Sequence, residues 1–176
     1  MSLAQYIKDR VHVDSYLREE DRNEEYARPT WKVTPFWKGI VMSKFQATCD
    51  DHCRLLYEFR IGSKRFLLKV DEHPDFLQCE HEMEIWSNLE REDKRYFVPL
   101  MCGEVKEDEP PWIVCPLVPN LRINDYASWI DRELVDNLVD KYQLDDMRFN
   151  ANWFMHNGRP LIVDYGLPSN RRSRNA

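Results

Sequence analysis

The chain has 176 residues, 43% of them hydrophobic, and a formal net charge of −6. This length fits one domain with its own core and leaves room for an added arm. The acidic balance argues against a nucleic-acid partner, because a phosphate-binding face needs clustered Lys and Arg.

The first 30 residues are predicted to form a helical arm. Residues 2–10 have the composition of a short helix, and Asp14 and Ser15 can cap a second, strongly acidic helix over 14–27. A charge run of this kind is usually a solvated helix face, and the alternative is an arm that binds a protein partner.

Pro29 ends this pattern, and an antiparallel sheet is predicted next. Its first three strands cover residues 31–46, 53–61 and 64–70, which are rich in aromatic, β-branched and alternating apolar residues. Gly62 and Ser63, between the second and third strands, are typical of a tight turn. The remaining elements are a helix over 75–90, strands over 96–101 and 111–118, a helix over 124–141, and a closing hairpin that turns near Asn157.

Oxygen ligands gather at the ends of the closing hairpin. Asp146 and Asn152 come before its first strand, and Asp164 follows its second strand, directly before Tyr165 and Gly166. A hard cation such as Mg²⁺ takes oxygen ligands, and a hairpin holds them in place. The pattern therefore indicates a Mg²⁺-dependent phosphoryl-transfer site, and the alternative is a surface hairpin with an acidic turn.

Four segments in the predicted strands, helix and hairpin contain candidate binding or catalytic residues. They are Phe66-Leu67-Leu68-Lys69-Val70, Glu80-His81-Glu82-Met83-Glu84, Trp112-Ile113-Val114-Cys115-Pro116-Leu117-Val118, and the pair Asn152-Trp153 with Val163-Asp164-Tyr165-Gly166. With the element order, they resemble the protein-kinase-like fold over residues 31–167, in particular the small divergent kinase-like proteins of phages and bacteria. The resemblance implies an α+β fold, in which a five-stranded antiparallel N-lobe sheet with one helix precedes a truncated C-lobe of one main helix and a catalytic-loop hairpin.

The resemblance implies a domain organisation as well. The expected parts are a helical N-terminal arm over 1–30, an N-lobe-like sheet and helix over 31–118, a truncated C-lobe over 119–168 and a disordered basic tail over 169–176.

The resemblance also implies residue roles at an ATP site. Lys69 would hold the nucleotide phosphates and Glu82 would pair with it, with Glu80 and Glu84 as competitors on the same helix. The backbone of Leu117 and Val118 would receive the adenine.

The metal and the acceptor are assigned to the closing hairpin by the same resemblance. Asp164 and Asn152 would bind Mg²⁺, and Asp146 would be the catalytic aspartate. The spacing leaves a second pair open, Asp145 with Asn150. The pair Asp146 and Asn152 is preferred because Asn152 leads directly into the strand.

The chain departs from the family at two places. The turn between the first two sheet strands has no glycine-rich loop, and it carries Asp50 and Asp51, which would weaken the hold on phosphates. Little chain follows Leu167, so the helices that bind a protein substrate are not expected. Two functions follow: a minimal ATP- and Mg²⁺-dependent phosphotransferase, or a catalytically inactive kinase-like protein that binds and regulates a host or partner protein.

The cysteines and the N-terminus favour a reduced, cytoplasmic protein. The five cysteines are irregularly spaced, and neither a signal peptide nor a membrane-spanning apolar run is recognisable. Cys49, His52 and Cys53 offer a weaker zinc alternative that lacks a second ligand pair. Nothing singles out one cysteine as a nucleophile.

Overall fold

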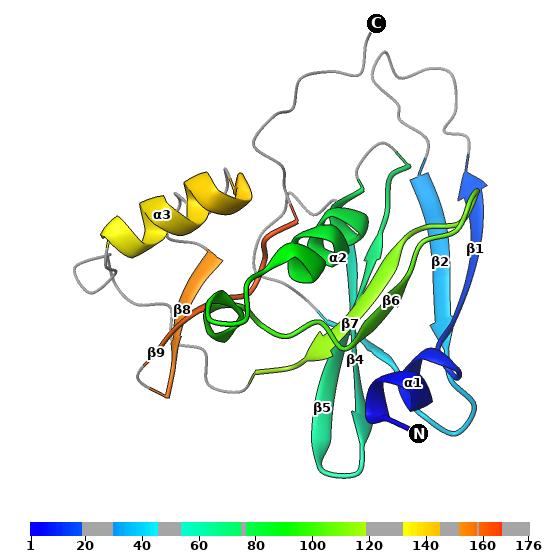
Figure 1. Ribbon diagram of the computed structural model, residues 1–176. Coiled ribbons are helices and arrows are strands. Elements are labelled where there is room, and N and C mark those ends of the chain that lie inside the picture. Colours follow the sequence, from blue (N-terminus) through cyan, green and yellow to red (C-terminus); the bar gives the residue numbers. More distant parts are fainter. Residues whose placement is uncertain are drawn as a thin grey trace, which may run out of the picture. The chain divides into compact units, whose positions relative to one another are not determined.

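The structure, a computed structural model, describes residues 1–18, 30–45, 54–74, 77–118, 132–144, 152–157 and 159–166. The chain divides into two compact units, and each is considered by itself (Figure 1). The first unit contains Met1–Glu80 and Leu100–Leu117, and the second contains His81–Pro99 and Val118–Ala176.

A five-stranded antiparallel sheet forms the centre of the first unit, as predicted. Its strands lie in the order β3-β4-β5-β7-β6. They are β3 (Ser43–Lys44), β4 (Arg54–Ile61), β5 (Lys64–Asp71), β6 (Cys102–Glu104) and β7 (Trp112–Pro116). Gly62 joins β4 to β5 at a φ of 60°, a left-handed conformation that glycine adopts without steric cost.

The prediction of a helix over 14–27 is wrong where the structure describes it. Residues His12–Arg18 form strand β1, which pairs antiparallel with β2 (Thr30–Phe36) in a two-stranded ribbon. Val11, Val13 and Ser15 face inward while His12, Asp14 and Tyr16 are exposed, which is the period of a strand. The many acidic residues made this alternation hard to recognise in the sequence. Pairing of β1 with β2 outweighed the local helix propensity. Residues 19–29 lie outside the described part of the chain.

The strand predicted over 31–46 is divided in two. A turn over Trp37–Ile40, with Gly39 at a φ of 86°, separates β2 from β3 and sends them to different sheets. The strand predicted over 96–101 is also misplaced, since β6 begins only at Cys102. Pro99 has no N–H for a ladder, and Phe97 instead forms an isolated parallel bridge to Ile162.

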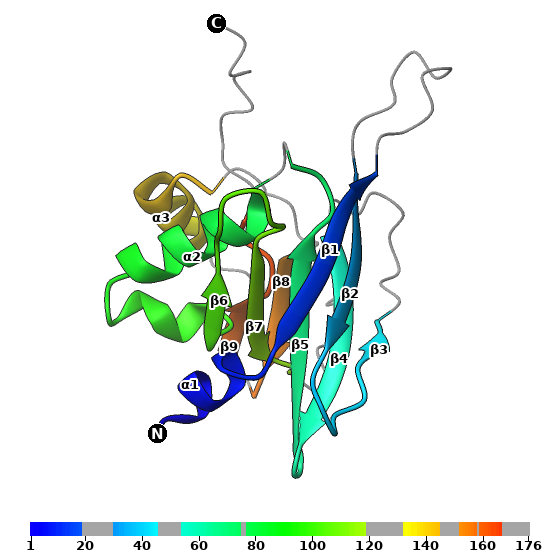
Figure 2. The same cartoon turned by 90° about the vertical axis from the view of Figure 1, so that its right-hand side faces the viewer.

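One face of the five-stranded sheet is covered by the β1–β2 ribbon and by α1 (Leu3–Lys8), which confirms the helix predicted over 2–10 (Figure 2). Aromatic and aliphatic residues from these elements form the core of the first unit. Its buried members are Ile7, Val11, Trp37, Phe59, Phe66, Leu68, Val70, Cys102, Trp112 and Val114.

The second unit has a separate core around a short hairpin. Its elements are most of α2 (Gln78–Asn88), the 3₁₀ helix η1 (Asp93–Tyr96), α3 (Arg132–Tyr142), β8 (Trp153–His156) and β9 (Arg159–Ile162). Helix α3 and the hairpin confirm two predictions, although residues 119–131 lie outside the described chain. The buried core residues are Leu89, Phe97, Val135, Leu138, Val139, Leu144, Trp153, Ile162 and Tyr165.

Candidate functional site

The face of the five-stranded sheet opposite the core carries buried charge. Alternation along β5 points Phe66, Leu68 and Val70 into the core, so Lys69 and Asp71 belong to the other face. Lys69 is 4% exposed and Asp71 is fully buried. Ionised side chains are rarely buried to this extent unless they are paired or have a function.

Arg54 adds a third buried charge to this face. It lies directly opposite Asp71 in the β4–β5 ladder and is 6% exposed. Residues opposite each other in a ladder project from the same face. Arg54, Lys69 and Asp71 are therefore neighbours on one sheet surface, and none of them is without a partner.

Helix α2 begins against this surface. The backbone N–H of Cys79 donates to both carboxylate oxygens of Asp71, at 3.2 and 3.0 Å, and the Cys79 thiol donates to the Lys69 carbonyl at 3.5 Å. A carboxylate is favourable here, because the first backbone N–H groups of a helix lack partners inside the helix and carry partial positive charge. The first turn of α2 is thus bonded to the part of β5 that carries Lys69.

Glu82 is the buried acid of α2. It is 2% exposed, whereas Glu80 is half-buried and Glu84 is exposed. Residues three apart share a helix face, so Glu82 follows Cys79 by one turn on the same side. Of the three acids considered from the sequence, burial therefore favours Glu82 as the one with a specific role.

In the second unit, the closing hairpin brings Asn152 and Asp164 to one end. Trp153 pairs with Ile162, and the carbonyl of Asn152 accepts a hydrogen bond from the Val163 N–H at 3.2 Å. Asn152 therefore stands beside the segment that leads from β9 into Asp164. The amide and the carboxylate supply oxygen ligands of the kind Mg²⁺ takes, so these residues fit that ion.

The residues after Asp164 are held firmly. The Tyr165 hydroxyl, on a side chain only 2% exposed, donates to the Val98 carbonyl at 3.2 Å. The Val98 N–H donates to the Ile162 carbonyl at 2.8 Å, and the Tyr165 ring meets Phe97 edge-on. These contacts restrict the exit of β9 and hence the backbone of Asp164.

Part of the backbone that was expected to bind adenine already forms a hydrogen bond within the first unit. Pro116 has no N–H, and the Leu117 N–H donates to the Arg65 carbonyl at 3.0 Å. Leu117 can therefore serve a base only through its carbonyl. The backbone N–H of Val118 is the next donor along the chain.

Several expected site residues lie outside the described residues. They are Asp146 and the competing pair Asp145 and Asn150, the acidic turn with Asp50 and Asp51, the possible zinc ligands Cys49, His52 and Cys53, and the basic tail. Among the described residues, no group of three or more His, Cys, Asp or Glu side chains is placed to hold a metal ion. Burial raises the pKa of the Cys102 thiol to about 12, despite an opposing effect of Lys8, so this cysteine is a poor nucleophile.

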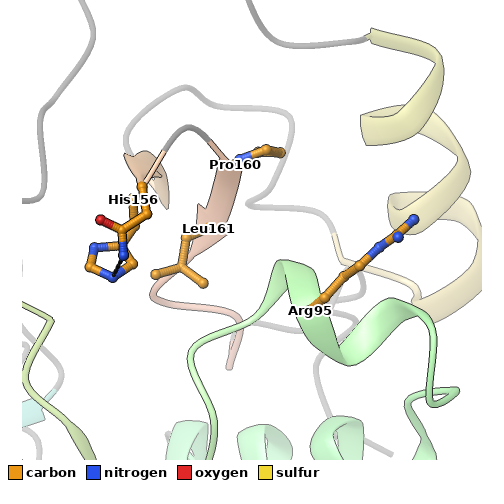
Figure 3. A pocket seen from close by; sticks show the side chains of 5 residues that line it. Arg95, His156, Pro160 and Leu161 are labelled. Carbon is orange, nitrogen blue, oxygen red and sulfur yellow. Dashed lines mark hydrogen bonds between the residues drawn. The ribbon is translucent and has the colours of Figure 1, made fainter.

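A hollow of about 350 Å³ lies on the second unit beside the hairpin (Figure 3). Its lining includes Arg95, His156, Pro160 and Leu161. The charged end of Arg95 points away from His156, with Leu161 between them, and donates to the Tyr96 hydroxyl at 2.7 Å. The two basic groups do not converge, so the hollow is not built as a phosphate site.

Arg54 and Asp71 were missed by sequence reasoning. Asp71 stands two residues after Lys69, and an alternating strand puts both on one face. That spacing was a usable signal, because two charged residues that follow an apolar run and lie two apart in a strand share one face. Arg54 had no comparable signal, since its burial depends on the register of β4 with β5.

No protein-family model matches the chain, and no curated protein matches it either. Within the described residues, no helix is long and apolar enough to cross a membrane.

Proposed function

We propose that this chain is a minimal protein-kinase-like phosphotransferase that binds Mg-ATP. Lys69 contacts the phosphates, and Glu82 orients Lys69. Asn152 and Asp164 would hold Mg²⁺, and Asp146 orients the acceptor hydroxyl. The observation that carries the proposal is the burial of Lys69 on the middle strand of the sheet, next to the helix start that leads to the buried Glu82.

The burial of Lys69 favours a role in binding anions. An ammonium removed from water is costly unless anions surround it, and nucleotide phosphates and a carboxylate are suitable anions. A glutamate that holds the ammonium in one place reduces the conformational entropy lost when phosphates bind. Lys69 and Glu82 then act as a preorganised phosphate clamp.

The hairpin supports the metal role. Asn152 and Asp164 provide an amide and a carboxylate from one end of a hairpin, and the hydrogen bond of Tyr165 limits the movement of its exit. When bound, Mg²⁺ would neutralise phosphate charge during transfer. Asp146 would accept a hydrogen bond from the acceptor hydroxyl and hold it in line with the terminal phosphate.

The segment expected to bind adenine favours a second function, that of an inactive binding protein. The Leu117 N–H is already bonded to Arg65, Pro116 offers no donor, and the sequence lacks a glycine-rich loop. Each feature reduces the hold on a nucleotide. They favour a kinase-like protein that has lost catalysis and acts by binding a partner protein.

A thermal-shift experiment tests the proposal. A ligand that binds only the folded state at 100 times its dissociation constant stabilises it by about 2.7 kcal/mol. We expect ATP with Mg²⁺ or Mn²⁺ to raise the melting temperature more than ATP alone. Lys69→Met should remove the rise, while Lys64→Met, an exposed residue of the same strand, should keep it.

The outcome also separates the two functions. A nucleotide-dependent shift followed by phosphate transfer to a generic protein substrate supports the enzyme. A shift without transfer supports the inactive binding protein, and no shift in the wild type contradicts ATP binding. We place either function in the cytoplasm, a proposal that the reduced, buried thiol of Cys102 supports.

A further inference from the structure

The strongest unexplained feature is the fully buried carboxylate of Asp71. The proposed reaction gives Asp71 no part, yet both of its oxygens accept hydrogen bonds from the Cys79 N–H. Taking a carboxylate out of water is costly and persists only where its partners compensate. Arg54 across the ladder and the start of α2 are the neighbours available to it.

The hydrogen bonds that the Asp71 carboxylate accepts from Cys79 lie next to Lys69. Asp71 is two residues beyond Lys69 on the same strand face, and Cys79 bonds to both residues, through its N–H and through its thiol. Because α2 is one continuous helix, fixing Cys79 also fixes the direction of Glu82 one turn later.

We propose that Asp71 is a positioning residue, which holds the first turn of α2 on β5 and thereby sets Glu82 against Lys69. The inference rests on the proposed function, since it gives Asp71 its role through the Lys69 and Glu82 pair.

The rate at which acetic anhydride labels Lys69, followed by mass spectrometry, provides the test. Only the uncharged amine reacts, and a lysine that loses its carboxylate partner is more easily deprotonated, by a factor of about ten for each pKa unit. We expect Asp71→Ala and Glu82→Gln each to raise the labelling rate about tenfold. The double variant should be no faster than either single variant, because both changes break the same arrangement.

Conservative and matched variants separate positioning from general loosening. Asp71→Asn keeps an acceptor for the Cys79 N–H and should label at close to the wild-type rate. Glu84→Gln removes an exposed charge from the same helix and should have no effect. Leu138→Ala destabilises the second core without touching Asp71, so it shows what lower stability alone does to the labelling rate.

Several labelling results would overturn the inference. Additive effects of Asp71→Ala and Glu82→Gln would overturn the inference, because Asp71 would then act on Lys69 directly. An unchanged rate in Asp71→Ala, or an equal rise in Leu138→Ala, would overturn it as well. Protection of Lys69 from labelling by Mg-ATP in the wild type tests the proposed function separately. If Mg-ATP does not protect Lys69 but the effects of Asp71→Ala and Glu82→Gln are not additive, ATP binding is rejected and the role of Asp71 is kept.

Discussion

Asp93 joins α3 to the segment that follows α2. Its Oδ2 accepts hydrogen bonds from the Tyr142 hydroxyl at 2.6 Å and from Lys141 Nζ at 2.9 Å, and Lys141 also reaches Glu90 Oε1 at 2.9 Å. Burial acts to raise the pKa of Asp93, but the hydrogen bonds from Tyr142 and Lys141 outweigh it and lower the pKa below its ordinary value.

This shift predicts a pH dependence of stability. A carboxyl group whose folded pKa is lowered stabilises the fold above its unfolded pKa of about 4 and loses that contribution as the pH falls through the folded value. Asp93→Asn should therefore cost about 1 kcal/mol of unfolding free energy near neutral pH and almost nothing in strong acid. Urea unfolding of both proteins across this range would measure it, and a difference that is constant with pH would contradict the assignment.

Tyr165 offers a second test of a single contact. Tyr165→Phe removes the buried hydroxyl that donates to Val98, and we expect a loss of about 1 kcal/mol. Tyr16→Phe is the matched control, since Tyr16 is 67% exposed. Equal stability of the two variants in urea would show that the hydroxyl contributes nothing to holding the hairpin exit.

Among the elements, β1 is the one whose type sequence reasoning missed. In the strand, Val13 packs against the core and Tyr16 faces solvent, whereas in a helix these residues, three apart, would share a face. Val13→Asp should therefore cost about 2 kcal/mol or more, while Tyr16→Asp should change stability by less than about 0.5 kcal/mol. Similar losses in both variants would favour the helix.

The elements that sequence reasoning predicted well carry their signals locally. Gly62 marks the β4–β5 turn, Asn157 adopts a φ of 51° at the closing turn, and β7 is a continuous apolar run. Strand β1 depends on pairing with β2, and the segment around Phe97 depends on its bridge to Ile162. Neither pairing can be predicted from the residues next to it in the sequence.

The candidate site shows the same division. Lys69, Glu82, Asn152 and Asp164 were proposed from the family resemblance, by their places in a strand, a helix and a hairpin. The buried set of Arg54 and Asp71 was not, because burial on this face follows from the sheet register and from the docking of α2. The N–H of Leu117 was misjudged for a similar reason, since its bond to Arg65 extends the β5–β7 ladder.

At the scale of the whole molecule, the proposal requires residues of both units to bind one nucleotide. Asp164→Ala should abolish Mg²⁺-dependent ATP binding measured by calorimetry, because it removes the only charged ligand we assign to the metal. Asp140→Ala, an exposed aspartate on α3, is the control and should bind as the wild type does. Unchanged affinity in Asp164→Ala would remove Asp164 from the metal site.

The most direct test follows the nuclear magnetic resonance signals of the backbone when Mn²⁺ replaces Mg²⁺ with bound ATP. Mn²⁺ takes the same oxygen ligands and broadens the signals of nearby nuclei. The account predicts that the amide signals of Lys69 and of Asn152 and Asp164 broaden together at low Mn²⁺, and only when ATP is present. Broadening at the hairpin alone, or at neither place, would contradict a single nucleotide site made by these residues.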